Sequence, residues 1–237
     1  MKKILILPFL ILCSLFYSQK INFESNLQIV YSLDFRPDST QAKRTDNVVT
    51  LYINKDTQKS IFQDDKKGKI DSIIASQKFT QLSSLPMFKT NHVIFKDLKK
   101  SEIVYSEVID KINFGYDEAI SNIKWKLDSE KKDILGYECF KAKTKFHGRD
   151  YIAWYTKDIP ISDGPYKFAG LPGLIIEIYD DKESFHYKVI AITKKSNNIL
   201  YDLGFNKIER IKLRDSKINN IIKYSKSEVR LNPMEKQ

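Results

Sequence analysis

Residues 137–156, YECFKAKTKFHGRDYIAWYT, have a pattern that is typical of a β-hairpin. Two stretches rich in aromatic and apolar side chains, residues 137–146 and 149–156, flank the dipeptide His147-Gly148. A two-residue turn that contains Gly suits the twist of two antiparallel strands. The pattern therefore predicts two paired strands in which Lys145 faces Asp150 and Lys141 faces Trp154.

This register is chemically sensible on both faces of the hairpin. A Lys beside an Asp and a Lys over an indole ring are both favourable cross-strand pairs. The other face carries small, hydroxyl and aromatic side chains, so we expect it to face the core: Phe140, Ala142, Thr144, Phe146, Ala153 and Tyr155.

The segment after the hairpin, residues 158–173, contains three Pro and three Gly and predicts an ordered, turn-rich crossover. Two interpretations remain open. In the first, the segment is a rigid corner that feeds a core strand at residues 174–179. In the second, it presents an aromatic platform and free backbone amides to a ligand or a partner strand. The candidate binding residues are Trp154, Tyr155, Tyr166, Phe168, Gly170, Pro172 and Gly173.

Residues 154–160 and 164–175, WYTKDIP and GPYKFAGLPGLI, resemble the GLPGLI family of Bacteroidetes envelope proteins. The namesake hexapeptide is intact at residues 170–175, and residues 136–139, 141–142 and 148–149 also look like the family pattern. The resemblance implies an exported protein, near outer-membrane transport systems, of unknown function. It brings no established activity and no catalytic residues.

Several other segments alternate between apolar and polar residues with the period of a strand. Between Asp65 and Pro86 the apolar residues instead have the spacing of an amphipathic helix. We expect a single, mainly β domain, built as a curved antiparallel sheet or half-barrel with one or two short helices; a β-sandwich is the alternative. The expected strands are residues 28–35, 48–53, 60–63, 92–98, 103–108, 123–127, 174–179, 185–193 and 207–214, and a second helix is expected at 218–224.

Residues 1–18 have the pattern of a secretory signal peptide, with Lys2 and Lys3 before an apolar run. We expect cleavage near Ser18, a mature domain at residues 19–237, and a location in the periplasm or at the outer-membrane periphery. The apolar run is too short to span a bilayer, so no transmembrane span is expected in the mature chain. Lipidation of Cys13 is a less favoured alternative, because no small residue precedes it.

Charge and cysteine content narrow the function classes further. The net charge of +10 falls to +8 without Lys2 and Lys3, but nucleic acid is not an expected partner of an exported protein. Cys139 would be the only thiol of the mature chain, so it has no intramolecular disulfide partner, and we expect it to be buried.

Catalytic and metal-binding motifs are missing from the sequence. It has no G-x-S-x-G, no C-x-x-C and no H-E-x-x-H pattern, so we expect neither a metal nor a cofactor, and the catalytic residues, if any, are unknown. The leading hypothesis is a non-enzymatic binding or assembly factor for a lipid, a peptide or an outer-membrane component such as a TonB-dependent transport protein. The alternative is a hydrolase or metal-dependent enzyme built on Cys139, His147 and His186.

Overall fold

Most of the described strands belong to one large β-sheet, which confirms the predicted mainly β class. In this computed structural model the described residues are 20–37, 39, 42–66, 90–202, 204–224 and 234–235. The strands are β1 (Lys20–Ser25), β2 (Leu27–Phe35), β3 (Thr45–Asn54), β4 (Lys59–Asp64), β5 (His92–Asp97), β6 (Glu102–Ile109), β7 (Ile112–Ala119), β8 (Lys126–Ile134), β9 (Tyr137–Phe146), β10 (Arg149–Thr156), β11 (Leu174–Asp180), β12 (Phe185–Thr193), β13 (Asn197–Asp202) and β14 (Asn206–Lys207).

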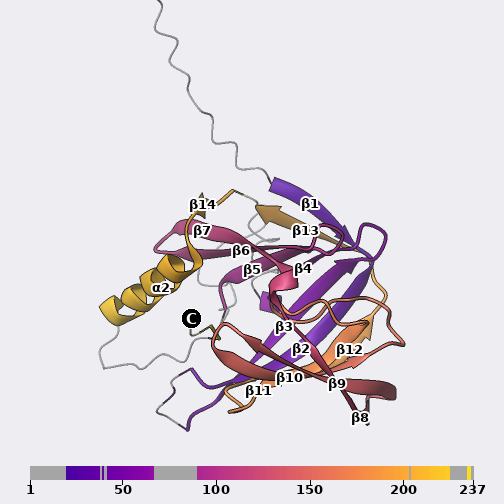
Figure 1. The fold of residues 1–237 in the computed structure, drawn as a ribbon. Helices are drawn as coiled ribbons and strands as arrows, with labels where there is room; N and C mark the ends of the chain where they lie inside the picture. The colour runs from indigo at the N-terminus through magenta and orange to yellow at the C-terminus, as the bar shows by residue number, and fades with distance from the viewer. Residues whose placement is uncertain are drawn as a thin grey trace, which may run out of the picture.

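Twelve of these strands form a single curved sheet that does not close (Figure 1). Their order is β14-β7-β6-β5-β4-β3-β2-β12-β11-β10-β9-β8, and all neighbours are antiparallel except β14 and β7. The strands β1 and β13 form a separate pair, which packs through Phe23, Ile199 and Tyr201 against Ile61 and Val93. The helix α2 (Arg210–Tyr224) lies beside the β7 end of the sheet.

The hairpin of β9 and β10 has the predicted register. Asp150 pairs with Lys145 and Trp154 pairs with Lys141, whose ammonium lies 5.4 Å from the centre of the indole ring. His147 and Gly148 both have positive φ angles, 44° and 78°, as the tight turn requires. Five of the six side chains predicted to face the core are buried, and Phe140 is half-buried.

The turn-rich crossover runs through the interior of the curved sheet. Lys167, Phe168, Ala169 and Leu171 are all buried, and the Phe168 ring contacts the rings of Phe146, Tyr151 and Trp125. The segment thus fills the space that a half-barrel would otherwise leave open, and it belongs to the main hydrophobic core.

Several details differ from the sequence-based expectation. Residues 210–214 are helical, so the strand expected at 207–214 is wrong, whereas the helix expected at 218–224 forms the last turns of α2. The strand expected at 123–127 begins only at Lys126 and continues to Ile134 as β8. Strands β1, β7 and β13 were not predicted. The signal peptide at 1–18 and nearly all of the helix expected at 65–86 lie outside the described residues.

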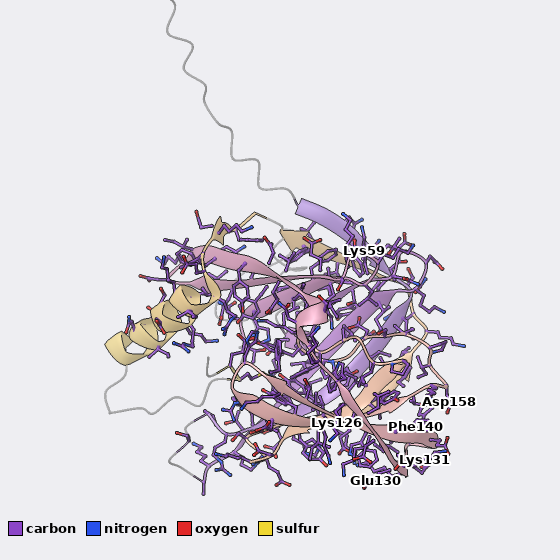
Figure 2. The ribbon with its side chains drawn as sticks, viewed as in Figure 1. Lys59, Lys126, Glu130, Lys131, Phe140 and Asp158 are labelled. Atoms are coloured by element: carbon purple, nitrogen blue, oxygen red, sulfur yellow. The ribbon has the colours of Figure 1, made fainter. Side chains whose placement is uncertain are left out.

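Strand β8 forms one edge of the sheet, and this position explains why the sequence pattern did not predict its full length. Its residues are largely exposed, including Lys126, Glu130 and Lys131, as Figure 2 shows along the β8–β9 edge. An edge strand with charged side chains on both faces has no apolar alternation, and such charges discourage pairing with another chain. Among the described residues no helix is long and apolar enough to cross a membrane.

Candidate ligand-binding cavity

An aromatic cavity of about 330 Å³ lies between the sheet and α2. It lies at the end where β2 finishes and where β5 and β12 begin. Residues from β2, β5, β6, β7, β12, the crossover and α2 line it, and most of the lining is apolar. Its rings are those of Phe35, His92, Tyr105, Tyr116, Tyr166, Phe185 and Tyr187.

His92 is a buried polar group of this cavity. The residue is 7% exposed, and its ring stacks on Tyr105 and meets the edge of Tyr166, with centroids 5.5 Å apart in both cases. Burial lowers the pKa of the imidazole to about 4, so the ring is neutral at pH 7. Within the described part of the chain, no residue hydrogen-bonds to this imidazole. A neutral imidazole carries one donor and one acceptor, which a ligand can satisfy.

The rim of the cavity is polar, but its charges are paired within the protein. Lys217 of α2 lies 2.7 Å from Oε1 of Glu107, and the Tyr105 hydroxyl donates a 2.7 Å hydrogen bond to Oε2 of the same carboxylate. Although burial alone would raise the pKa of Glu107, Lys217 and its other partners lower it below its ordinary value. The ion pair of Lys217 and Glu107 therefore gives the rim fixed dipoles but no net charge.

Residues Met234 and Glu235 of the C-terminal segment also line the cavity. The Tyr151 hydroxyl donates a 2.9 Å hydrogen bond to the Met234 carbonyl oxygen, and the Glu235 side chain accepts a 2.7 Å hydrogen bond from the Tyr166 hydroxyl.

A buried lysine, Lys167, lies behind Glu235. Its ammonium lies 2.5 Å from Oε1 of Glu235, from Oε1 of Glu118 and from the Tyr116 hydroxyl. The rings of Tyr105, Tyr116 and Tyr166 lie 5.0, 4.6 and 5.5 Å from the same ammonium. Burial would raise the pKa of Glu235, but Lys167, His147 and the Tyr166 hydroxyl together lower this pKa to about 2.

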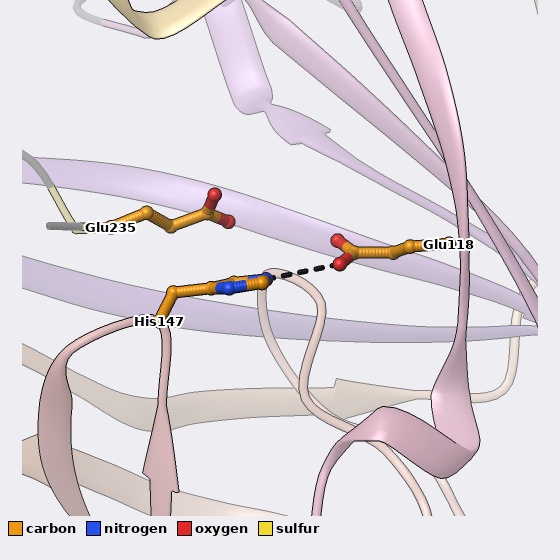
Figure 3. A group of neighbouring side chains, drawn as sticks. All are labelled: Glu118, His147 and Glu235. Atoms are coloured by element: carbon orange, nitrogen blue, oxygen red, sulfur yellow. Dashed lines mark hydrogen bonds and ion pairs between the residues drawn. The ribbon is translucent and has the colours of Figure 1, made fainter. Parts of the chain in front are cut away.

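Glu118, His147 and Glu235 come close enough to suggest a metal site, with one ligand atom of each within 4.8 Å of the others (Figure 3). His147 Nε2 lies 3.0 Å from Oε2 of Glu118. However, the Lys167 ammonium already bridges the two carboxylates, and Arg210 lies 3.2 Å from Oε2 of Glu235. Two carboxylates beside two cations form a charge-balanced network, so this arrangement works chemically as an ion-pair cluster.

The candidate binding residues from the sequence are mostly buried. Trp154 and Tyr155 are 3% exposed and Phe168 is fully buried, so these rings do not form an exposed platform. Tyr166 lines the aromatic cavity. Gly173 packs against the Thr156 carbonyl group at the start of β11, and Leu171, beside Pro172, is buried. A binding role for this set stays a prediction.

A second cavity, of about 960 Å³, lies at the other end of the strands and has a mixed lining of aliphatic and polar side chains. Leu27, Ile53, Ile120 and Ile192 contribute to it, and so does Gly170 of the crossover. Because Tyr166 lines the first cavity and Gly170 the second, the crossover separates the two.

The three residues of the alternative enzymatic hypothesis have different partners. His147 contacts Glu118 and His186 lies 2.9 Å from Oε1 of Glu177, and within the described residues no hydrogen bond joins Cys139 to either imidazole. The Cys139 side chain is buried, as the sequence predicted. Sequence reasoning missed His92, Glu118 and Glu235, because nothing local marks residues whose partners are far away in the chain.

Cys139 is expected to resist alkylation in the folded protein. Burial raises the pKa of its thiol to about 11, so only about one thiol in a thousand is ionised at pH 8. Iodoacetamide at pH 8 should leave the native chain unlabelled over hours and label it fully in denaturant, as read by intact mass. Rapid labelling without denaturant would contradict the buried position.

Comparison with known proteins gives a short family match and a shared fold. Residues 147–177 match a family model described as a protein of unknown function (Porph_ging). No curated protein matches the chain. Two structures of PNGF-II, in space groups P21 and C2, are similar, with TM-scores of 0.55 and 0.54 and identities of 17% and 18%. Each similarity covers 82% of this chain and 33% of PNGF-II, so the chain spans about a third of that protein.

Proposed function

We propose that the chain is a non-enzymatic binding protein of the bacterial envelope, which holds the apolar part of a ligand in its aromatic cavity. The observation that carries this proposal is the cavity itself, with its rings and the buried His92 imidazole that no described residue hydrogen-bonds. Ligand pockets are mostly apolar, have about this volume, and contain a few polar groups that orient the ligand.

The placement in the envelope rests on the sequence. The basic and apolar start at residues 1–18 favours export, and the GPYKFAGLPGLI segment favours membership of the GLPGLI family of Bacteroidetes. The Porph_ging match to residues 147–177 overlaps that segment and supports a shared family feature there. Within this proposal the protein works in the periplasm or at the outer-membrane periphery, with an outer-membrane or TonB-dependent transport component as its partner.

The similarity to PNGF-II is compatible with a binding role. The shared fold accounts for a third of PNGF-II, so this fold occurs as one part of a longer chain. A module that recurs in this way fits an accessory or binding function. Because identity is 17–18%, the similarity concerns the fold, and activity is not transferred.

A titration with the neutral fluorophore N-phenyl-1-naphthylamine tests the cavity. The wild-type chain is expected to bind it saturably with one site, because burial of its rings removes apolar surface from water. Ile218→Trp, which adds bulk to the α2 wall of the cavity, should weaken binding by at least about tenfold, equivalent to about 1.4 kcal/mol.

The matched control is Ile211→Trp on the same helix. Ile211 is 49% exposed and does not line the cavity, so this variant should bind the fluorophore as the wild type does. Equal weakening by both substitutions, or no saturable binding by the wild type, would refute the cavity as the binding site.

A further inference from the structure

The carboxylate of Glu235 occupies a binding site that other parts of the chain build. Oε1 accepts hydrogen bonds from the Lys167 ammonium at 2.5 Å and from the Tyr166 hydroxyl at 2.7 Å, and Oε2 accepts one from Arg210 at 3.2 Å. These donors come from the crossover and from α2. A carboxylate that receives charge-assisted hydrogen bonds from two cations is held strongly and specifically.

Met234 is recognised at the same time as Glu235. Its carbonyl oxygen accepts a 2.9 Å hydrogen bond from the Tyr151 hydroxyl, and its thioether lies 3.1 Å from the Tyr187 hydroxyl. Both tyrosines belong to the sheet, in β10 and β12. The two residues are thus contacted as a short peptide is, through a main-chain carbonyl, an apolar side chain and an acidic side chain.

The charges of the site require an anion at the position of Glu235. Without that carboxylate, the cations Lys167 and Arg210 would face a single carboxylate, Glu118, around the buried ammonium. Lys167 would keep Glu118 but lose one of its two carboxylate partners, and weakening the pairing of a buried cation is costly.

We propose that the aromatic cavity recognises a peptide segment in which an apolar residue precedes an acidic one, and that Met234–Glu235 occupies this site as an intramolecular ligand. This inference rests on the proposed binding function and names its ligand class. An external peptide binds by displacing the chain's own segment. The peptide that fits this site has an apolar side chain near Tyr187 and a carboxylate between Lys167, Tyr166 and Arg210.

The test uses the full chain with Glu235→Ala and a capped peptide, acetyl-Asn-Pro-Met-Glu-Lys-amide, which copies residues 232–236. Isothermal titration should show one peptide per chain. Binding should be at least about tenfold tighter than for the same peptide with Gln in place of Glu, because a charged acceptor is lost. The wild type should bind the peptide at least about tenfold more weakly than the variant, because its own segment competes at high effective concentration.

Two further variants keep the test informative. Glu235→Gln retains the size of the side chain and serves if Glu235→Ala does not fold. Glu209→Ala removes an exposed acidic residue next to α2, which pairs with Lys212, and should behave as the wild type.

Equal affinity for the Glu and Gln peptides would overturn the proposal. So would stabilisation of Glu235→Ala by sodium acetate with no additional gain from the peptide, since that result would show a general anion site. Binding of N-phenyl-1-naphthylamine distinguishes failure of the peptide inference from failure of the cavity function. If the fluorophore binds and the peptide does not, the peptide inference fails while the cavity function stands; if neither binds, both fail.

Discussion

Replacement of Gly173 by alanine is expected to destabilise the folded chain by about 3 kcal/mol, because it overpacks the start of β11. A Cβ atom at this position would lie 1.9 Å from the Thr156 carbonyl oxygen and 2.7 Å from its carbon. These are backbone atoms of β10, which cannot move without disturbing its pairing with β11. The φ angle of +155° also disfavours a side chain. For a chain of this size the melting temperature should fall by roughly 6–12 °C.

The control for this prediction is Gly136→Ala, in the turn between β8 and β9. Gly136 has a φ angle of +79°, but a Cβ atom at this turn would have no neighbour within 4 Å. The cost is therefore the conformational one alone, about 1–2 kcal/mol. Urea unfolding of both variants, followed by circular dichroism, separates close packing from backbone conformation. Equal losses would show that the approach of Gly173 to Thr156 is unimportant.

Lys96→Met is expected to cost about 3–5 kcal/mol of folding free energy, because it leaves a buried carboxylate without its cation. The side chains of Lys96 and Asp163 are both fully buried, and their charged atoms lie 2.5 Å apart. The ammonium also donates to the carbonyl oxygens of Gly164 and Tyr166, at 2.6 and 3.1 Å. Lys96 thus holds the crossover against β5. The measurement is the free energy of unfolding from urea titrations.

Two comparisons make this prediction specific. Lys212→Met breaks a 3.1 Å ion pair with Glu209 in which both side chains are exposed, and should cost less than about 1 kcal/mol. The double variant Lys96→Met/Asp163→Leu removes both charges and should recover part of the stability lost by Lys96→Met. A cost below about 1 kcal/mol for Lys96→Met would contradict a clamping role for this pair.

The part of the fold that the sequence predicts best is the hairpin at 137–156. Local chemistry determines it: the Gly148 turn sets the register, and the alternating side chains set the face. The strand at 28–35 was predicted for the same reason, since its alternate residues are buried against the core. Such local signals do not show how far the sheet curves or where its edges lie.

The elements that were missed have weak or ambiguous patterns. In β8, charged residues point to both faces, so the strand depends on pairing with β9 rather than on burial. In the first half of α2, apolar residues alternate with charged ones, which resembles an exposed strand. Within the described part of this stretch, Leu213 is the residue buried in the core. Packing against the rest of the fold decides whether a segment with such a pattern forms a strand or a helix.

The candidate site could be predicted only in part. Tyr166 was selected as a binding residue from its motif, and it lines the cavity. The network around Lys167 could not be found, because Lys167 and Glu235 are 68 positions apart in the sequence. Lys167 itself looks like an ordinary solvated lysine in the sequence. Its burial follows from the path of the crossover through the interior of the sheet, which is a property of the whole fold.

Native mass spectrometry of the chain purified from the cells that make it is the decisive test of the aromatic cavity as a binding site. We predict a bound ligand as a defined mass increment, which persists in Ile211→Trp and is lost in Ile218→Trp. The increment would identify the ligand class, and a peptide mass would support the recognition of an acidic segment. A bare chain in all three proteins, together with no fluorophore binding by the wild type, would contradict a binding role for the cavity.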